Sequence, residues 1–183
     1  MYHPEGGQGM KIVKWLDEHF EEVLIVVLST IMVVVIFLQV FMRYVMESSL
    51  SWSEELARYS FIWLVYIGIS YGVKKQRHIK VDAFLLLFKD KGKLIFNIIA
   101  NFLFLAFAIF VVIYGYTITE RFLEFGQKSP ANQIPMALIY LAAPFGMALT
   151  SIRLIQNIIK QFKTLFGKGD FTVKTELERL RED

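Results

Sequence analysis

Four long apolar blocks limit what this sequence can fold into. They cover residues 23–42, 56–73, 94–118 and 134–155. A helix needs about 20 apolar residues to cross the hydrocarbon core of a bilayer, which is about 30 Å thick. Each block is long enough, and 55% of the chain is hydrophobic, against about 45–50% in an ordinary soluble domain. The sequence therefore predicts an all-α integral membrane protein with four transmembrane helices.

The alternative for the first block is a signal peptide. Its 20 residues exceed the usual apolar run of about 7–15 residues in such peptides. Acidic residues also precede it, including Glu21 and Glu22, where a signal peptide carries positive charge. We therefore assign the first block as a membrane helix.

The positions of lysine and arginine predict the orientation of the chain. Of the 20 such residues, 16 lie before the first block, between the second and third blocks, or from Arg153 at the end of the fourth block onward. Because cytoplasmic loops carry the excess of positive charge, both termini and the middle loop are expected in the cytoplasm. The net charge of +3 reflects this bias and needs no nucleic-acid partner.

The chain outside the blocks is expected to be short and peripheral. Residues 1–22 are predicted to hold a loose leader and a surface amphipathic helix, ahead of a membrane domain over residues 23–159. Residues 160–183 are expected to form a cytoplasmic tail. Six consecutive apolar residues after Asp82 predict a second short interfacial helix, with Asp82 as its cap.

The second block is preceded by a charged segment, WSEELARY (residues 52–59). Ser51 and Glu54 have the spacing of a capping box, which predicts a helix start at residue 52. Glu54 and Glu55 precede Arg58 by four and three residues, so both are expected to reach its guanidinium group. One interpretation is a self-neutralised helix start at the lipid headgroups. The other is a polar contact with a second protein, and spacing alone leaves both open.

The blocks contain no residues that point to catalysis or cofactor binding. No charged residue lies near the middle of a block, where ion and substrate paths are usually marked. The three histidines lie outside the blocks and the chain has no cysteine, which leaves no bis-histidine haem site or thiol pair. We therefore predict no enzyme, no catalytic residue, no cofactor and no metal site.

Small and polar residues within the blocks favour helix packing instead. Gly68 and Gly72 give the second block a GxxxG face, and Asn97 and Asn101 are expected to hydrogen bond between helices. These faces would either close the four helices on one another or dock a partner. The fourth block contributes a small-residue stripe and a proline expected to bend the helix: Ala142, Gly146, Thr150 and Pro144.

Several of these segments together resemble the small membrane subunit of TRAP transporters (tripartite ATP-independent periplasmic transporters, DctQ-like). An aromatic–x–Glu–Glu–x–x–Arg pattern begins the second block, followed by a tryptophan and a glycine. A basic–His–Ile–x–x–Asp pattern follows the block. SPANQIP (residues 129–135) and LAAPFG (residues 141–146) resemble the last outer loop and the fourth helix of the family. The matching positions are Trp52, Glu54, Glu55, Arg58, Trp63, Gly68, Arg77, His78, Ile79 and Asp82.

The resemblance implies a transporter of three parts in the bacterial inner membrane. A periplasmic binding protein would capture an organic acid, such as sialic acid or a C4-dicarboxylate. A large membrane subunit would carry the substrate and sodium sites, and this multi-pass chain would support it in the lipid bilayer. The implied subunit interface consists of Trp52, Glu54, Glu55, Arg58, Tyr59, Trp63, Gly68 and Gly72. The implied anchor in the cytoplasmic loop consists of Arg77, His78 and Asp82.

Two other classes of protein stay open. A stand-alone four-helix channel or small transporter would need a polar lumen, for which Asn97 and Asn101 are the one hint. A membrane-bound enzyme or assembly factor would need a site that the sequence does not reveal. Flux through the purified chain would support the first class, and a bound chromophore would support the second.

Overall fold

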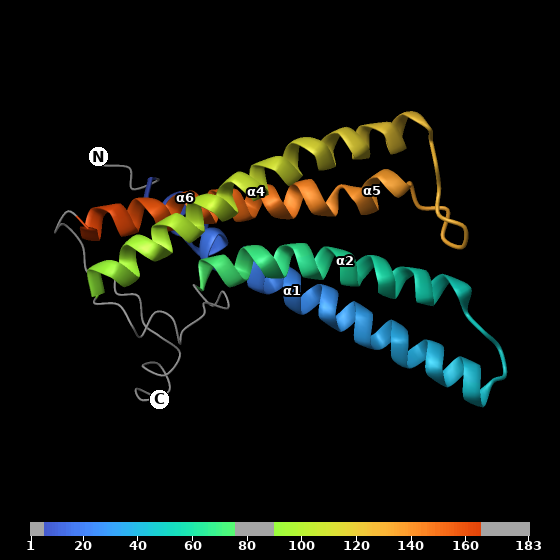
Figure 1. Cartoon of the computed structure of the whole chain (residues 1–183). Coiled ribbons are helices and arrows are strands. Elements are labelled where there is room, and N and C mark those ends of the chain that lie inside the picture. Colours follow the sequence, from blue (N-terminus) through green and yellow to red (C-terminus); the bar gives the residue numbers. More distant parts are fainter. Residues whose placement is uncertain (1–5, 76–89, 166–183) are drawn as a thin grey trace.

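The computed structural model describes residues 6–75 and 90–165, which form five helices (Figure 1). Four stretches of this part are long and apolar enough to cross a membrane, which confirms the predicted all-α fold with four spans. The helices are α1 (Gly6–Val45), α2 (Ser51–Lys74), α4 (Asp90–Glu124), α5 (Met136–Tyr140) and α6 (Ala142–Leu165). The predicted helix over residues 83–88, the loop anchor Arg77, His78 and Asp82, and the tail beyond residue 165 lie outside the described residues.

The first helix is longer than its apolar block. The sequence predicted a loose leader over residues 1–10 and a separate surface helix, but α1 runs without a break from Gly6 to Val45. Its 40 residues correspond to about 60 Å at 1.5 Å per residue. That is about twice the thickness of the hydrocarbon core. The charged residues before the first block therefore do not interrupt the helix.

The four spans are arranged as an open row. α1 packs on α2, α2 packs on α6, and α6 packs on α4. The α1–α2 pair and the α4–α6 pair lie close at one end and diverge toward the other (Figure 1). We name these the converging end, where α2 and α6 finish, and the loop end, which carries the connections over residues 46–50 and 125–135. The outer helices keep large exposed apolar side chains, such as Phe37 and Leu103, so both present apolar faces to the bilayer or to a partner.

The two pairs meet where α6 carries its small-residue stripe. A Cβ atom added to Gly146 would lie 2.6 Å from Cβ of Tyr66 on α2, so only glycine fits there without a shift. Ala142 and Thr150, one turn to either side of Gly146, are both 0% exposed. The predicted stripe in the fourth block therefore packs inside this chain.

The fourth span is not one regular helix. A turn at Leu141 separates α5 from α6, although Leu141 and Phe145 still donate backbone hydrogen bonds to Ala137 and Leu141. Pro144 has no backbone N–H to continue this ladder. Its buried ring packs against α4, where a Cβ added to Gly115 would lie 3.2 Å from the proline Cδ. The proline thus serves the contact between α6 and α4.

Candidate functional site

The charged start of α2 divides into two separate interactions. Arg58 pairs with Glu54 at 3.2 Å, and both side chains are more than 60% exposed. Glu55 makes no ion pair with Arg58 because its carboxylate accepts hydrogen bonds from the connection between α4 and α5. The prediction that both glutamates reach Arg58 is therefore wrong. The predicted capping box is also absent. The helix begins at Ser51, one residue early, and has no side-chain cap.

Glu55 is the centre of a buried cluster that joins α2 to the connection between α4 and α5. Its carboxylate is 6% exposed and accepts hydrogen bonds from Tyr59 Oη (2.7 Å), Ser129 Oγ (3.1 Å), Asn132 N (2.7 Å) and Asn132 Nδ2 (2.9 Å). Asn132 Nδ2 also donates to the carbonyl oxygen of Trp52 (2.9 Å). Hydrogen bonds to an ionised acceptor are stronger than neutral ones. We name these four residues, Glu55, Tyr59, Ser129 and Asn132, the Glu55 cluster.

The connection held by the Glu55 cluster is a compact turn. Ser129 N donates to the carbonyl oxygen of Ile134 (2.8 Å), and Ser129 Oγ accepts from Ile134 N (3.1 Å). Gln133 adopts a positive φ of 55°, the left-handed region that non-glycine residues rarely occupy. The SPANQIP segment is therefore tied both to itself and to α2, which fixes its shape at the loop end.

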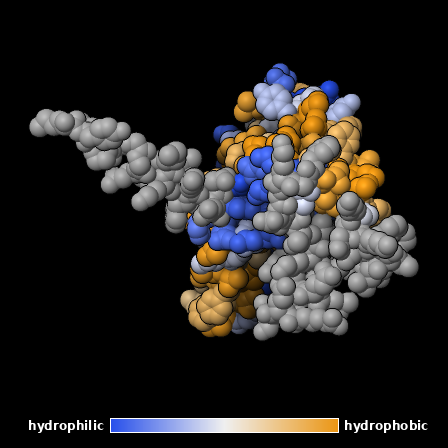
Figure 2. All heavy atoms as spheres, turned by 90° about the vertical axis from the view of Figure 1, so that its left-hand side faces the viewer, coloured by the Kyte–Doolittle hydropathy of each residue, from blue (hydrophilic) through white to orange (hydrophobic). Residues whose placement is uncertain are grey.

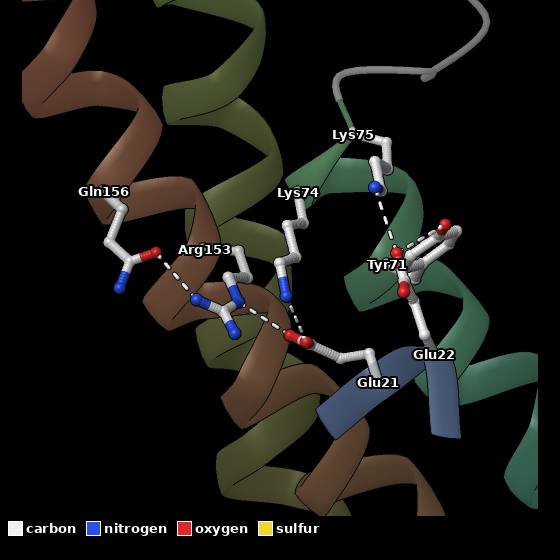
Figure 3. Close-up of polar contacts among 7 residues, drawn as sticks. All are labelled: Glu21, Glu22, Tyr71, Lys74, Lys75, Arg153 and Gln156. Carbon is white, nitrogen blue, oxygen red and sulfur yellow. Dashed lines mark hydrogen bonds and ion pairs between the residues drawn. The ribbon is translucent and has the colours of Figure 1, made fainter. Parts of the chain in front are cut away.

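A second buried carboxylate lies at the converging end (Figure 3). Glu21 of α1 is 0% exposed and accepts from Lys74 Nζ of α2 (2.8 Å) and from Arg153 Nε of α6 (2.6 Å). Arg153 also donates through Nη1 to Gln156 Oε1 (3.1 Å). One carboxylate thus connects three helices. We name Glu21, Lys74, Arg153 and Gln156 the Glu21 cluster.

A half-exposed ion pair lies beside the Glu21 cluster. Glu22 pairs with Lys75 Nζ at 3.0 Å and accepts from Tyr71 Oη at 3.1 Å. The hydrogen bond and the negative charge of Glu22 raise the pKa of Lys75 above its usual value. Figure 2, which looks onto this end, shows hydrophilic atoms gathered between hydrophobic surfaces. The polar side chains of the Glu21 cluster and of the Glu22–Lys75 pair therefore lie together at the converging end.

Amides of α6 and α4 extend the polar contacts along α6. Asn157 Nδ2 donates to the carbonyl oxygen of Val73 (2.8 Å), and Asn101 Nδ2 donates to Gln161 Oε1 (3.1 Å). Asn101 therefore makes the kind of interhelical bond that the sequence suggested, while its neighbour Asn97 is 3% exposed. These bonds close the gap between neighbouring helices rather than line a polar channel.

Sequence reasoning missed the Glu21 cluster. Two signals were available: acidic residues directly before an apolar block, and Arg153 inside the last turns of another block. Each is costly to place in a membrane alone. The two charges neutralise each other once α1 and α6 are brought together. A search for opposite charges at the same depth in different blocks would have paired them.

The remaining residues of the predicted interface lie on different faces of α2. Trp63 is half-buried, with its ring centroid 5.7 Å from that of Phe145 on α6, and Trp52 is 39% exposed. A Cβ atom added to Gly68 or Gly72 would meet no atom within 4 Å. Among the residues that the structure describes, the GxxxG face therefore has no close partner.

The arrangement offers pairing and packing rather than reactive groups. Within residues 6–75 and 90–165, no three His, Cys, Asp or Glu side chains gather as metal ligands. Both oxygens of each buried carboxylate accept hydrogen bonds, and each carboxylate has donors from other segments. The geometry thus defines a small four-span membrane protein whose buried charges are satisfied inside the chain.

Comparison with known proteins identifies the family. Residues 32–164 match the family described as "Tripartite ATP-independent periplasmic transporters, DctQ component", and the chain belongs to it. This match confirms the resemblance seen in the sequence. The chain is accordingly a small permease subunit of the TRAP type and a multi-pass protein of the bacterial inner membrane.

The relatives carry different substrate names. The chain is 29% identical to the C4-dicarboxylate TRAP transporter small permease protein DctQ of Vibrio cholerae, over 85% of this chain and 76% of that protein. It is also 29% identical to the isethionate TRAP transporter permease protein DctMQ of Oleidesulfovibrio alaskensis, over 88% of this chain. A third relative, the sialic acid TRAP transporter permease protein SiaT of Haemophilus influenzae, is 29% identical over 85% of this chain. The aligned region spans 26% of DctMQ and 24% of SiaT, about a quarter of each. These relatives are transporter subunits, not enzymes.

Proposed function

We propose that this chain supports a large TRAP membrane subunit during sodium-driven uptake of an organic acid delivered by a periplasmic binding protein. The observation that carries the proposal is the open face of α2, formed by Phe61, Val65, Gly68 and Gly72. Their spacing of four, three and four residues places them on one side of the helix. Phe61 and Val65 are 52% and 41% exposed, and the two glycines have open space beside them. Paired glycines let a second membrane helix approach closely, so this face suits a helix of the large subunit.

The distribution of charge along the sequence favours an accessory role for this chain beside the large subunit. Residues 23–42, 59–73, 94–119 and 129–152 contain no Asp, Glu, Lys, Arg or His. Ionisable groups at such depths usually mark ion and substrate paths. The sodium and substrate sites would accordingly belong to the large subunit.

The longer relatives also support association. In DctMQ and SiaT the region like this chain is about a quarter of one permease polypeptide. Because this region and the rest of the permease form one polypeptide in these relatives, we expect the corresponding parts to associate when they are separate chains. The three relatives name three organic anions at the same 29% identity. We propose sialic acid or a C4-dicarboxylate as the substrate class, with selection made on the partner chains.

The orientation belongs to the same proposal. The excess of lysine and arginine supports a cytoplasmic position for the converging end and the loop anchor (Arg77, His78 and Asp82), and a periplasmic position for the loop end. The turn held by the Glu55 cluster would then face the space where the binding protein arrives. A turn fixed in advance loses less conformational freedom when a partner docks.

The test is co-purification with the large TRAP membrane subunit of the same transporter. Gly68→Leu with Gly72→Leu places two side chains on the open face, where an added Cβ atom would meet no described atom within 4 Å. We expect the double variant to insert normally but to lose most of the co-purified large subunit and the uptake of sialic acid or C4-dicarboxylate in proteoliposomes. Ala106→Leu, at an exposed position of α4, is the control and should keep both. Full assembly and uptake in the double variant would rule out this face as the interface.

A further inference from the structure

A groove of about 480 Å³ opens between α2 and the α5–α6 segment in the half of the protein nearest the loop end. Its volume falls within the range of small-ligand sites, about 300–1,000 Å³. Neither the family nor the proposed subunit contact assigns a role to it. Its lining includes Arg58, Ile62 and Tyr66 of α2 and Met136, Ile139 and Ala143 of the α5–α6 segment.

The groove follows from the way the helices cross. α2 and α6 approach closely at Tyr66 and Gly146, and the two helix pairs diverge toward the loop end (Figure 1). Tyr66 therefore forms the inner limit of the groove and Arg58 lies at its mouth. The two residues are eight positions apart, which corresponds to about 12 Å along α2. We expect this stretch to run from the headgroup region into the hydrocarbon region of the bilayer.

The inner part of the groove is apolar. Ile62, Met136, Ile139 and Ala143 line it together with the rings of Tyr66 and Tyr140. The lining residues of α2 recur at intervals of three or four, so the groove runs along the helix. A long apolar slot that runs along the spans fits an extended hydrocarbon chain.

The mouth carries one exposed positive and one exposed negative charge. Glu54 and Arg58 lie 3.2 Å apart, with side chains 64% and 61% exposed. Arginine binds phosphate oxygens well through its several N–H donors, and a carboxylate accepts hydrogen bonds from a primary ammonium. The nearby Glu55 already accepts four hydrogen bonds and adds negative charge. A purely anionic headgroup would therefore be repelled, whereas a headgroup with both charges would find a partner for each.

We propose that the groove binds one zwitterionic phospholipid with a primary ammonium, of which phosphatidylethanolamine is the probe. The phosphate contacts Arg58 and the ammonium contacts Glu54. One acyl chain lies between α2 and α5–α6 and ends near Tyr66. The bound lipid fills the divergence between the two helix pairs and leaves the open glycine face of α2 free.

Native mass spectrometry of the delipidated full-length chain tests the proposal. Phosphatidylethanolamine, phosphatidylcholine and phosphatidylglycerol with identical acyl chains are added separately, and the fraction with one bound lipid is measured. We expect phosphatidylethanolamine to be retained about tenfold better than the other two, as for one hydrogen bond to a charged group. Phosphatidylcholine has no ammonium N–H to donate, and phosphatidylglycerol has no cation for Glu54.

Two pairs of variants separate the headgroup from the chain. Glu54→Gln and Arg58→Gln change only exposed side chains, so we expect the fold to persist. Glu54→Gln should lower the retention of phosphatidylethanolamine to about that of phosphatidylglycerol, and Arg58→Gln should lower the retention of all three lipids. Ala143→Phe fills the groove and should abolish retention of every lipid. Ala106→Phe makes the same change at an exposed position of α4 and should have no effect. Circular dichroism of each variant checks that it is folded.

Two outcomes would overturn the proposal. The first is equal retention of the three lipids in the wild type, or retention by folded Ala143→Phe. The second comes from the assembled transporter: since the chain has no cysteine, a single Ala143→Cys variant is a clean probe. Cross-linking from this position to the large subunit would show that protein, not lipid, occupies the groove. Lipid retention in the wild type with no such cross-link supports the proposal.

Discussion

The two ends of this protein each bury a carboxylate but satisfy it in different ways. At the converging end, Glu21 meets two cations, Lys74 and Arg153, that come from two other helices. At the loop end, Glu55 meets hydroxyl and amide donors, mostly from one connection. The first arrangement balances charge between spans and holds helices together. The second leaves a charge in place, solvated by polar groups, and holds a turn. The same chemical group thus stabilises the packing of helices at one end and the shape of a surface at the other.

The first prediction tests whether the two clusters lie on opposite sides of the membrane. Single cysteines at Lys128 and Lys163, both exposed, are unambiguous because the chain has none of its own. In intact spheroplasts, Lys128→Cys should react fully with an impermeant thiol reagent and Lys163→Cys should not react. Permeabilised cells, in which both positions react, are the control. Labelling of both positions in intact spheroplasts would show that the two ends do not lie on opposite sides of the membrane.

The second prediction concerns Glu21. Glu21→Gln removes the buried carboxylate that Lys74 and Arg153 share, and removing one member of a buried ion pair costs about 3–5 kcal/mol. Their side chains are only 17% and 9% exposed, so water offers little compensation. We expect most of the purified protein to unfold or aggregate, measured by tryptophan fluorescence during heating in detergent.

A second variant of the cluster sharpens this result. Arg153→Met removes one of the two cations from the cluster, and Lys74 remains to pair with Glu21. The Arg153→Met variant should therefore lose less stability than Glu21→Gln. Equal stability of the wild type and Glu21→Gln would show that the cluster does not hold the helices.

The third prediction concerns Glu55. Glu55→Gln replaces one oxygen by an NH₂ group that faces donors, so at least one hydrogen bond to a charged acceptor is lost. The four helices should remain packed, because the Glu21 cluster is distant and unchanged. The turn should loosen: a cysteine at Lys128 should react about tenfold faster, the equivalent of one such bond. An unchanged labelling rate would mean that the turn holds its shape without Glu55.

These differences explain which parts of the structure could be predicted from sequence. The spans follow from hydropathy because each block carries its own signal. The Glu54–Arg58 pair follows from spacing along one helix. The partners of Glu55 do not, because Ser129 and Asn132 lie 74 and 77 residues away. The same spacing rule failed for Glu55, since several buried donors compete better for a carboxylate than one exposed cation.

The Glu21 cluster shows the same limit across a longer distance. Glu21 and Arg153 are separated by 132 residues, and each looked like the edge of its own block. The order of helices in the row decides that they meet, and that order is not written in local periodicity. The continuous α1 was missed for a related reason, because charges before the apolar block resembled a boundary between two helices.

The last prediction concerns the exposed pair beside the Glu21 cluster and should give the smallest effect. Glu22 and Lys75 are 32% and 45% exposed, and ion pairs in contact with water contribute little. Glu22→Gln should change Tm by no more than about 2 °C at pH 7. The pKa of Lys75 is raised by Glu22, so its contribution is fully present below the unfolded pKa, about 10.4, and is lost as pH rises through the folded pKa. The small difference in Tm between wild type and Glu22→Gln should therefore shrink above that pH. A decrease in Tm as large as that of Glu21→Gln would instead show that Glu21 and Glu22 act together in holding the helices. The comparison between the two ends would then have to include both glutamates.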